Sequence, residues 1–383
     1  MGPRNIQSSM IRFFFICTFA ISLFSLQGCP SDNSNANNEY LYATNQSDNT
    51  ISGFVINPTS GTLSAIPGSP FSSEGSAPVS IAITPNGKWA YAINQNTNSI
   101  ASFSINPSSG TLSPLLGYVA SSATNLVKAN IDSSGAFLYV LNQGSGSSNT
   151  NTLYGYAINP ENGALAALPG SPFVISAAGL ATTLAIDPQD RFIYAAINNS
   201  GNSYIDVLGL TSNTGIPTNT GTTYLQGGSN PTSISINAAG TLIFLSNLSG
   251  YISVSSINAS SGALSPVTGS PFPTTGVEGP AGLAITPSNN FLLVANQNSS
   301  NIQSYSIDTS SGFLTSTGLP VSSSSLPSAI AIEPNGNFLF VGNGGNSTIS
   351  VFSVSSSGLL KQIGSYASGH SPSAIAISKP AQN

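Results

Sequence analysis

A pattern of alternating aromatic and apolar residues that ends in Asn recurs seven times along this chain of 383 residues, and it constrains the fold more than any other feature. Seven copies at one approximate spacing indicate a repeat architecture, in which each repeat is one structural unit. We interpret the seven Asn residues as turn formers rather than ligands, because Asn caps its own backbone. They are separated by 47 to 56 residues, at Asn45, Asn94, Asn142, Asn198, Asn247, Asn296 and Asn343.

Each repeat contains four short segments of alternating hydrophobicity, bounded by Gly, Pro, Asn and Ser, and such segments indicate β-strands. In the second repeat we expect strands at Ser80–Thr84, Trp89–Asn94, Ile100–Ile105 and Thr111–Leu116. Four strands in about fifty residues are typical of one blade of a β-propeller. The sequence therefore predicts an all-β fold, a seven-bladed β-propeller with four-stranded blades.

A second recurring segment, Pro-Ser-x-Ile-Ala-Ile, precedes every repeat except the first. Its last copy, Ser371–Ser378, has no repeat behind it. We therefore predict that this final strand completes blade 1 and closes the ring, which removes the open edge between the first and last blades. A single propeller domain over residues 39–378 follows, with a short tail at residues 379–383.

Residues 1–28 have the layout of a secretory signal. Arg4 and Arg12 precede an apolar core, Phe13–Leu26, and no acidic residue is present. This core is too short for a membrane-spanning helix, which needs about twenty residues. Met1 and Met10 both remain open as the start of the protein.

Leu26-Gln27-Gly28-Cys29 resembles the lipobox of bacterial lipoproteins, and the resemblance implies that Cys29 carries the lipid. The alternative is ordinary cleavage nearby, with Cys29 unmodified. Pro30 stands where Asp would signal retention in the inner membrane of enteric bacteria, so we expect an exported protein anchored at the outer membrane or cell surface. Residues 29–38 are polar and are expected to form a flexible tether.

Charged residues make up only 5% of the chain. Without Arg4 and Arg12, 5 basic residues face 12 acidic ones, a net charge of −7. This balance excludes a basic surface for nucleic acid. No cluster of His, Cys, Asp and Glu has metal-ligand spacing, so we expect neither metal nor cofactor. We expect a monomer that meets the membrane only through its lipid anchor.

Residues 327–359 combine the repeat's motifs, from Pro-Ser-x-Ile-Ala-Ile through Pro-Asn-Gly and Phe-Leu-x-Val-x-Asn to Ser-Gly-x-Leu. From Glu39 to about Ser378 the chain resembles the YVTN-type repeats of the lactonase-like seven-bladed β-propeller family. That family includes 6-phosphogluconolactonases, a carboxymuconate cyclase and many propellers without established activity. Its lactonases often carry an Asn-Glu pair where this chain has Asn-Gln, as at Asn94-Gln95, and Gln cannot act as a base at neutral pH.

Residues that break the repeat are the candidates for a site. His370 and Glu278 each lie two residues before the proline of a predicted inner strand, and Glu74 lies four before one. We predict a binding site for these three at the channel mouth, joined by Lys128, which replaces an apolar residue in an inner strand. The alternative is that the three are independent, solvated loop residues. Arg191 is expected on the surface.

The sequence favours a non-catalytic binding or interaction module at the cell envelope, whose partner is an unidentified envelope protein, polysaccharide or small ligand. One alternative is a lactonase-type hydrolase, whose catalysis would rest on His370, Glu278 and Lys128. A further alternative is a structural surface protein.

Overall fold

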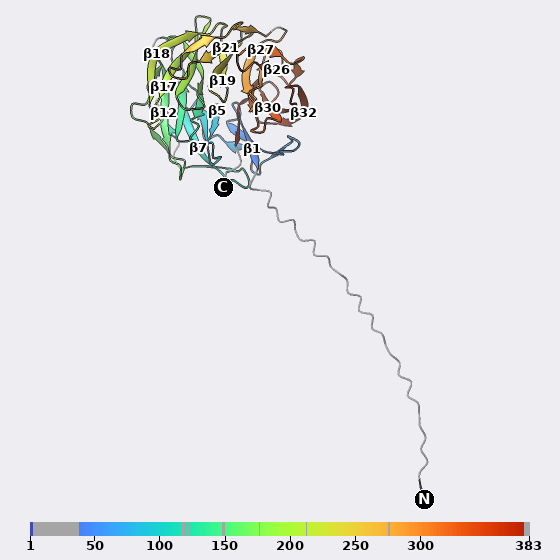
Figure 1. Ribbon diagram of the computed structural model, residues 1–383. Helices are drawn as coiled ribbons and strands as arrows, with labels where there is room; N and C mark the ends of the chain where they lie inside the picture. The colour runs from blue at the N-terminus through green and yellow to red at the C-terminus, as the bar shows by residue number, and fades with distance from the viewer. Residues whose placement is uncertain are drawn as a thin grey trace. The chain divides into compact units, whose positions relative to one another are not determined.

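All regular structure in the described part of the chain is β-strand, and the strands form seven antiparallel sheets (Figure 1). The computed structural model describes residues 1–2, 38–115, 119–120, 123–147, 150–175, 177–211, 213–274 and 276–378. The chain divides into Met1–Asn33 and Ser34–Asn383, and the sheets belong to the second unit. No helix among the described residues is long and apolar enough to cross a membrane. Cys29, the tether as far as residue 37 and the tail lie outside these residues.

Each sheet is one blade, and its first strand lies against the first strands of both neighbouring blades. These innermost strands are β5 (Pro78–Ile83), β10 (Leu126–Ile131), β15 (Leu180–Ile186), β19 (Pro231–Ile236), β24 (Pro280–Ile285), β29 (Pro327–Ile332) and β33 (Pro372–Ser378). The second strands are β1 (Glu39–Asn45), β6 (Trp89–Asn94), β11 (Phe137–Asn142), β16 (Phe192–Asn199), β20 (Leu242–Asn247), β25 (Phe291–Asn296) and β30 (Phe338–Asn343). This order is the one that the alternation in the sequence predicts.

The third and outermost strands complete each blade. The third strands are β2 (Thr50–Ile56), β7 (Ser99–Ile105), β12 (Asn151–Ile158), β17 (Asn202–Leu210), β21 (Tyr251–Ile257), β26 (Asn301–Ile307) and β31 (Thr348–Val354). Two blades have long outermost strands, β18 (Pro217–Leu225) and β32 (Leu360–Ala367). In the other five the outer edge is split between β3 (Leu63–Ala65) and β4 (Phe71–Ser72), β8 (Leu112–Pro114) and β9 (Val119–Ala120), β13 (Leu165–Ala167) and β14 (Phe173–Ile175), β22 (Leu264–Pro266) and β23 (Phe272–Pro273), and β27 (Leu314–Ser316) and β28 (Val321–Ser322).

The two ends of the propeller chain meet in blade 1. Strand β33 pairs antiparallel with β1, from Tyr40 opposite Ser378 to Asn45 opposite Pro372. Beyond this pairing, Nδ1 of His370 lies 2.9 Å from Oδ1 of Asp48, so the β32–β33 connection is also joined to the turn after β1. The prediction that the last strand completes the first blade is confirmed.

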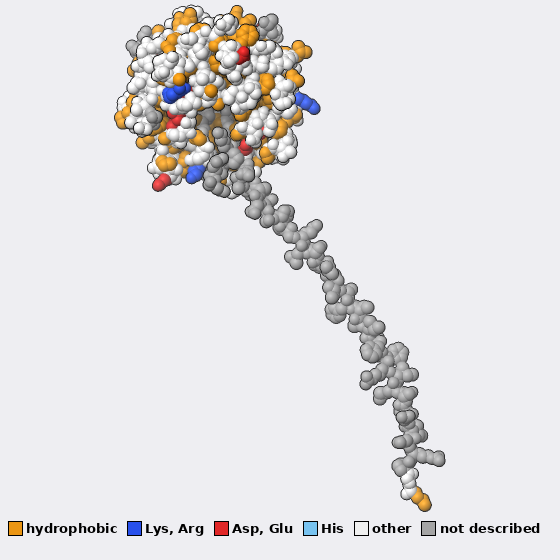
Figure 2. Space-filling view, in the orientation of Figure 1, with side chains coloured by type: hydrophobic (Ala, Val, Ile, Leu, Met, Phe, Trp, Pro, Cys, Tyr) orange, Lys and Arg blue, Asp and Glu red, His pale blue; other side chains and the backbone are white. Residues whose placement is uncertain are grey.

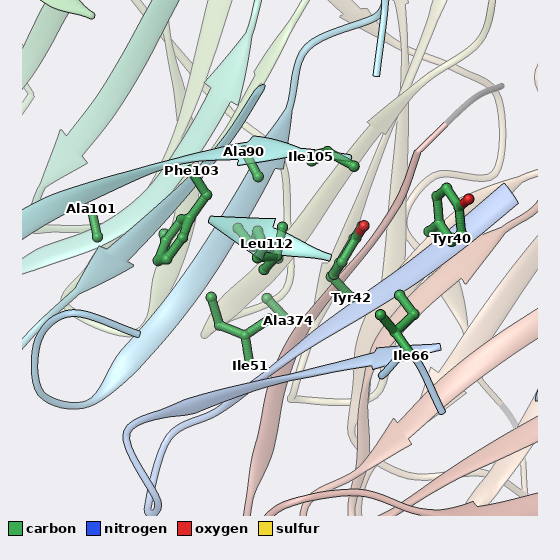
Figure 3. Close-up of a cluster of buried hydrophobic side chains, with 12 residues drawn as sticks. Tyr40, Tyr42, Ile51, Ile66, Ala90, Ala101, Phe103, Ile105, Leu112 and Ala374 are labelled. Atoms are coloured by element: carbon green, nitrogen blue, oxygen red, sulfur yellow. The ribbon is translucent and has the colours of Figure 1, made fainter. Parts of the chain in front are cut away.

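Every large apolar core of the ring lies between two blades. The described residues form seven clusters of buried side chains, one at each junction, including the junction of blade 7 with blade 1. Figure 3 shows the cluster between blades 1 and 2, to which blade 1 contributes Tyr42 and Ile51 and blade 2 contributes Phe103 and Leu112. A blade outside the ring would expose apolar surface on both faces, so the blades depend on one another for stability.

A glycine in the turn after each third strand lets neighbouring blades approach closely. At Gly163, whose φ is +69°, an added Cβ would lie 2.7 Å from the ring of Trp89 in the preceding blade, and the Gly163 carbonyl accepts a 2.9 Å hydrogen bond from Tyr91. The Ser-Gly motif of the repeat is therefore a packing device rather than a site. Equivalent contacts join Gly61 to Phe338, Gly110 to Tyr40, Gly215 to Phe137, Gly262 to Phe192 and Gly358 to Phe291.

Two buried carboxyl groups lie at the junction of blades 7 and 1, and the sequence gives no sign of them. Glu39 is 6% exposed, and Glu333 is fully buried. Glu333 accepts a 3.0 Å hydrogen bond from the Asn337 amide, whereas one oxygen of each carboxyl group has no partner among the described residues. Burial, and next the charge of Glu333, raise the pKa of Glu39 to about 7. The junction therefore favours a protonated Glu39.

We expect the protein to lose stability as the pH rises from 5.5 to 8. The folded-state pKa of Glu39 lies above its ordinary value of 4.5, so its contribution is complete below pH 4.5 and is lost as the pH passes about 7. The loss should be on the order of 2 kcal/mol in the free energy of unfolding. Chemical unfolding followed across this range should show a smaller pH dependence in Glu39→Gln and an unchanged one in the exposed control Glu161→Gln. An equal pH dependence in both variants would contradict the assignment.

Deletion of residues 371–383 should destabilise the whole ring. The deletion removes β33 and its hydrogen bonds to β1, and it exposes the apolar cores on both sides of blade 1. We expect the free energy of unfolding to fall by about 5 kcal/mol or more, because several hydrogen bonds and buried side chains are lost at once. Thermal unfolding by circular dichroism would measure the effect, with deletion of residues 379–383 alone as the control. Equal melting temperatures for the two deletions would refute the role of β33 in closing the ring.

Candidate functional site

The innermost strands enclose a cavity of about 350 Å³ on the axis of the ring. Residues from all seven strands line it, together with Gln297, which follows the end of β25. The wall consists of apolar residues, hydroxyl groups and amide groups, and Lys128 is the one charged residue among the described residues that line it. Charged side chains are also few and lie apart on the outer face in Figure 2. Lys128 is therefore a single charge in a cavity wall whose other described residues are uncharged.

Lys128 lies just after an irregularity at the start of β10, and the other six innermost strands share this irregularity. Leu126 pairs with Asn142 and Lys128 with Leu141, so Val127 is an extra residue in the strand. A bulge of this kind redirects the side chains beside it. The register places small residues at the equivalent positions of the other blades, namely Ser80, Thr183, Ser233, Gly282, Ala329 and Ala374. The expectation that Lys128 replaces an apolar residue is corrected accordingly, because three of these six are polar, one is Gly and only two are Ala.

The ammonium group of Lys128 is half-buried and lacks a counter-ion. Burial lowers its pKa, and no hydrogen bond or ion pair of this side chain is found within the described part of the chain. A charge partly removed from water without a partner is unfavourable, so this group favours an anionic partner and loses its proton more readily than an exposed lysine. No other blade offers this chemistry among the described residues of the cavity lining.

Several polar groups of the channel wall are used to join adjacent blades. Ser373 donates a hydrogen bond of 2.7 Å to the carbonyl of Pro78, and Asn130 donates one of 3.0 Å to the carbonyl of Leu184. Within the described residues the side chain of Gln297 makes no such bond. Gln297 belongs to blade 6 and Lys128 to blade 3, three blades away around the ring. These two side chains, which have no hydrogen-bond partner among the described residues, therefore approach from opposite walls.

A chain of amide groups joins three adjacent blades next to the start of β10. Nε2 of Gln95 donates to Oδ1 of Asn125 at 2.8 Å, and Nδ2 of Asn125 donates to Oε1 of Gln143 at 2.9 Å. Gln143 in turn donates to the carbonyl of Ala181 at 2.9 Å. The chain links blades 2, 3 and 4, and Asn125 directly precedes β10. The Asn-Gln pairs are visible in the sequence, but the bonds by which Gln95 and Gln143 join three blades are not.

The other three predicted site residues do not line the cavity. Glu74, Glu278 and His370 all lie in connections that lead into innermost strands, as expected, and all three are exposed. The His370 side chain is 75% exposed and is hydrogen-bonded to Asp48 at the ring closure. The structure therefore brings Lys128 alone into the channel.

Six of the seven strand-ending Asn residues are buried, and their side chains are hydrogen-bonded within the blade or to the segment that joins it to the preceding blade. Nδ2 of Asn45, for example, donates to Thr50 and Ser52, both at 2.9 Å, which ties β1 to β2. Blade 4 departs from the pattern, because fully buried Ile197 takes this position and Asn198 lies one residue further along. The interpretation as structural residues is confirmed for the six.

Arg191 is more than a surface residue. Its Nε and Nη2 atoms lie 2.6 and 2.8 Å from the carboxylate oxygens of buried Asp187, and its guanidinium also donates to the carbonyls of Gly240 and Ala259 in the next blade. It therefore joins blades 4 and 5. No group of three or more His, Cys, Asp or Glu within the described residues is placed to hold a metal ion.

Comparison with known proteins agrees with this architecture. The family model described as "Lactonase, 7-bladed beta-propeller" matches residues 33–129, 225–325 and 319–382. No curated protein matches the chain.

Three solved structures illustrate the similarity, and each is matched over 90% of this chain and 99% of its own. A "putative 6-phosphogluconolactonase" from Bacteroides fragilis has a TM-score of 0.72 at 18% identity. The periplasmic gluconolactonase of Pseudomonas aeruginosa has 0.71 at 19%, and a protein of unknown function from Desulfotomaculum acetoxidans has 0.71 at 15%. At these identities the likeness shows the fold alone.

Proposed function

Since this chain belongs to the lactonase family of seven-bladed β-propellers, we propose that it uses the family's ring as a non-catalytic binding module. The ligand is held at the Lys128 end of the central channel. A fold carries many functions, so membership in the family supplies the scaffold and the residues of the site must supply the argument.

The composition of the channel wall carries this proposal. Opening a lactone needs a base or an activated water, together with donors for the developing oxyanion. The amide groups and Lys128 are donors, but the described lining residues include no carboxylate and no histidine. Amides and hydroxyl groups around one cation are instead well suited to hold a polar ligand in place, as specific pockets commonly do with a few placed polar groups.

Lactone hydrolysis is a second candidate, and it is favoured by the low pKa of Lys128. A lysine that loses its proton more readily can act as a base or a nucleophile. Two of the similar solved structures are named for lactonases, although the low identity carries no residue of their sites to this chain. In this mechanism Lys128 would act alone, because His370 and Glu278 do not line the cavity.

We expect fragment 30–383 to hydrolyse sugar and acyl lactones no faster than its Lys128→Met variant, because the channel lacks a carboxylate or histidine base. Release of acid, followed by a pH indicator, would measure the rate. His370→Ala and Glu278→Gln serve as controls, since both residues are exposed and lie outside the cavity lining. Hydrolysis that disappears in Lys128→Met but persists in both controls would contradict the binding-module proposal and support lactone hydrolysis by Lys128.

We also propose that the protein is exported and lipid-anchored through Cys29, and that it works as a monomer at the cell envelope. The signal-like residues 1–28 and the lipobox-like Leu26–Cys29 support this location. A charge-poor, polar domain on a tether would then present its channel to envelope polysaccharides, proteins or small ligands.

Cys29→Ser should release the protein from the membrane fraction, because the thiol that would carry the lipid is lost. Fractionation of cells that express the full chain, with detection by antibody, would measure the distribution. Cys17→Ser is the matched control, since Cys17 lies inside the signal core and is removed with it. Retention of Cys29→Ser in membranes would rule out an anchor at this residue.

A further inference from the structure

The cavity around Lys128 also indicates the chemical class of the ligand, an inference that rests on the proposed function. We infer that the channel takes an acidic monosaccharide, a hydroxylated ligand with a single carboxylate, whose charge is bound by Lys128 of β10 and whose hydroxyl groups meet the amide and hydroxyl wall.

The sign of the ligand's charge follows from the surroundings of Lys128. Among the described residues no other charged or titratable side chain lines the cavity, so nothing in the wall neutralises the ammonium group. An opposite charge on the ligand would supply that partner through a charge-assisted hydrogen bond in a partly buried site. A neutral ligand would leave the ammonium group unpaired, and a cation would add a second uncompensated charge.

The number of charged residues in the cavity wall indicates how much negative charge the ligand carries. One lysine balances one negative charge, whereas a phosphate monoester brings between one and a half and two at neutral pH. The remainder would be left in a cavity with no second cation and no helix N-terminus to hold it, since the described residues contain no helix. A single carboxylate therefore fits this site better than a phosphate does.

The polar wall accounts for the rest of the ligand. Gln297 faces Lys128 from the other side of the ring with its amide uncommitted among the described residues, and Ser233 and Ser328 add hydroxyl groups to the lining. Such groups both donate and accept, which matches the hydroxyl groups of a sugar. A cavity of about 350 Å³ corresponds to about a dozen water volumes, which is the size of one monosaccharide.

The test compares glucuronate with glucose, which differ in one carboxylate, by isothermal titration calorimetry on the purified full chain. We expect glucuronate to bind about tenfold more tightly or better at pH 7. Lys128→Met should abolish this preference, and Lys128→Arg should preserve it because the charge remains. Lys88→Met is the matched control, since Lys88 is exposed and does not line the channel. Far-ultraviolet circular dichroism would verify that each variant is folded.

The pH dependence gives a second readout. Because burial lowers the pKa of Lys128, the glucuronate preference should decline at a lower pH than an ordinary lysine would produce, and it should persist longer in Lys128→Arg. Equal binding of both sugars would overturn the inference while leaving the binding module intact. A preference that survives in Lys128→Met, or tighter binding of inorganic phosphate than of glucuronate, would also overturn it. Absence of binding by every saccharide tested would overturn the inference and leave the binding module with a ligand of another chemical class.

Discussion

The pairing of β33 with β1 is the interaction on which the rest of this structure depends. Each core lies between two blades, so the apolar surface of blade 1 is covered on both sides only when blade 7 returns to it. The main-chain ladder from Tyr40 to Asn45 makes that return specific, and the Asp48–His370 contact lies at its end. Disulfides play no part in this design, since packing and closure alone hold the two ends of the domain.

Low charge shapes how the blades are joined. With so few ionisable groups, the ring relies on aromatic rings packed against glycines and on Tyr hydroxyl groups that donate to glycine carbonyls, at Tyr42, Tyr91, Tyr139 and Tyr194. Blades 5 to 7 have Phe244, Leu293 and Phe340 at the same register and keep only the packing. The Arg191–Asp187 pair is an exception in that it uses charge, and it serves the same purpose of joining two blades.

Periodicity made the ring predictable, because every blade repeats the same alternation and the unclaimed last copy had one place to go. Features that depend on contacts between distant residues were not predictable in this way. Glu39 and Glu333 lie close together only because blade 7 adjoins blade 1, and the contact of His370 with Asp48 likewise depends on the ring closure. In blade 4 Ile197 occupies the position of the strand-ending Asn. The Asn motif alone could not reveal this shift of one residue.

A ring of nearly equivalent blades would by itself make a channel with seven nearly equivalent walls, and such a channel offers a ligand little orientation. One substitution at one register breaks this equivalence, since Lys128 stands where the other blades have Ser, Thr, Gly or Ala. The amide chain from Gln95 to Ala181 passes through Asn125, directly before β10, and so ties the start of that strand to both neighbouring blades. A larger set of charged residues is then not required to orient a ligand, because a single cation in a neutral wall already distinguishes one end of the ligand from the other.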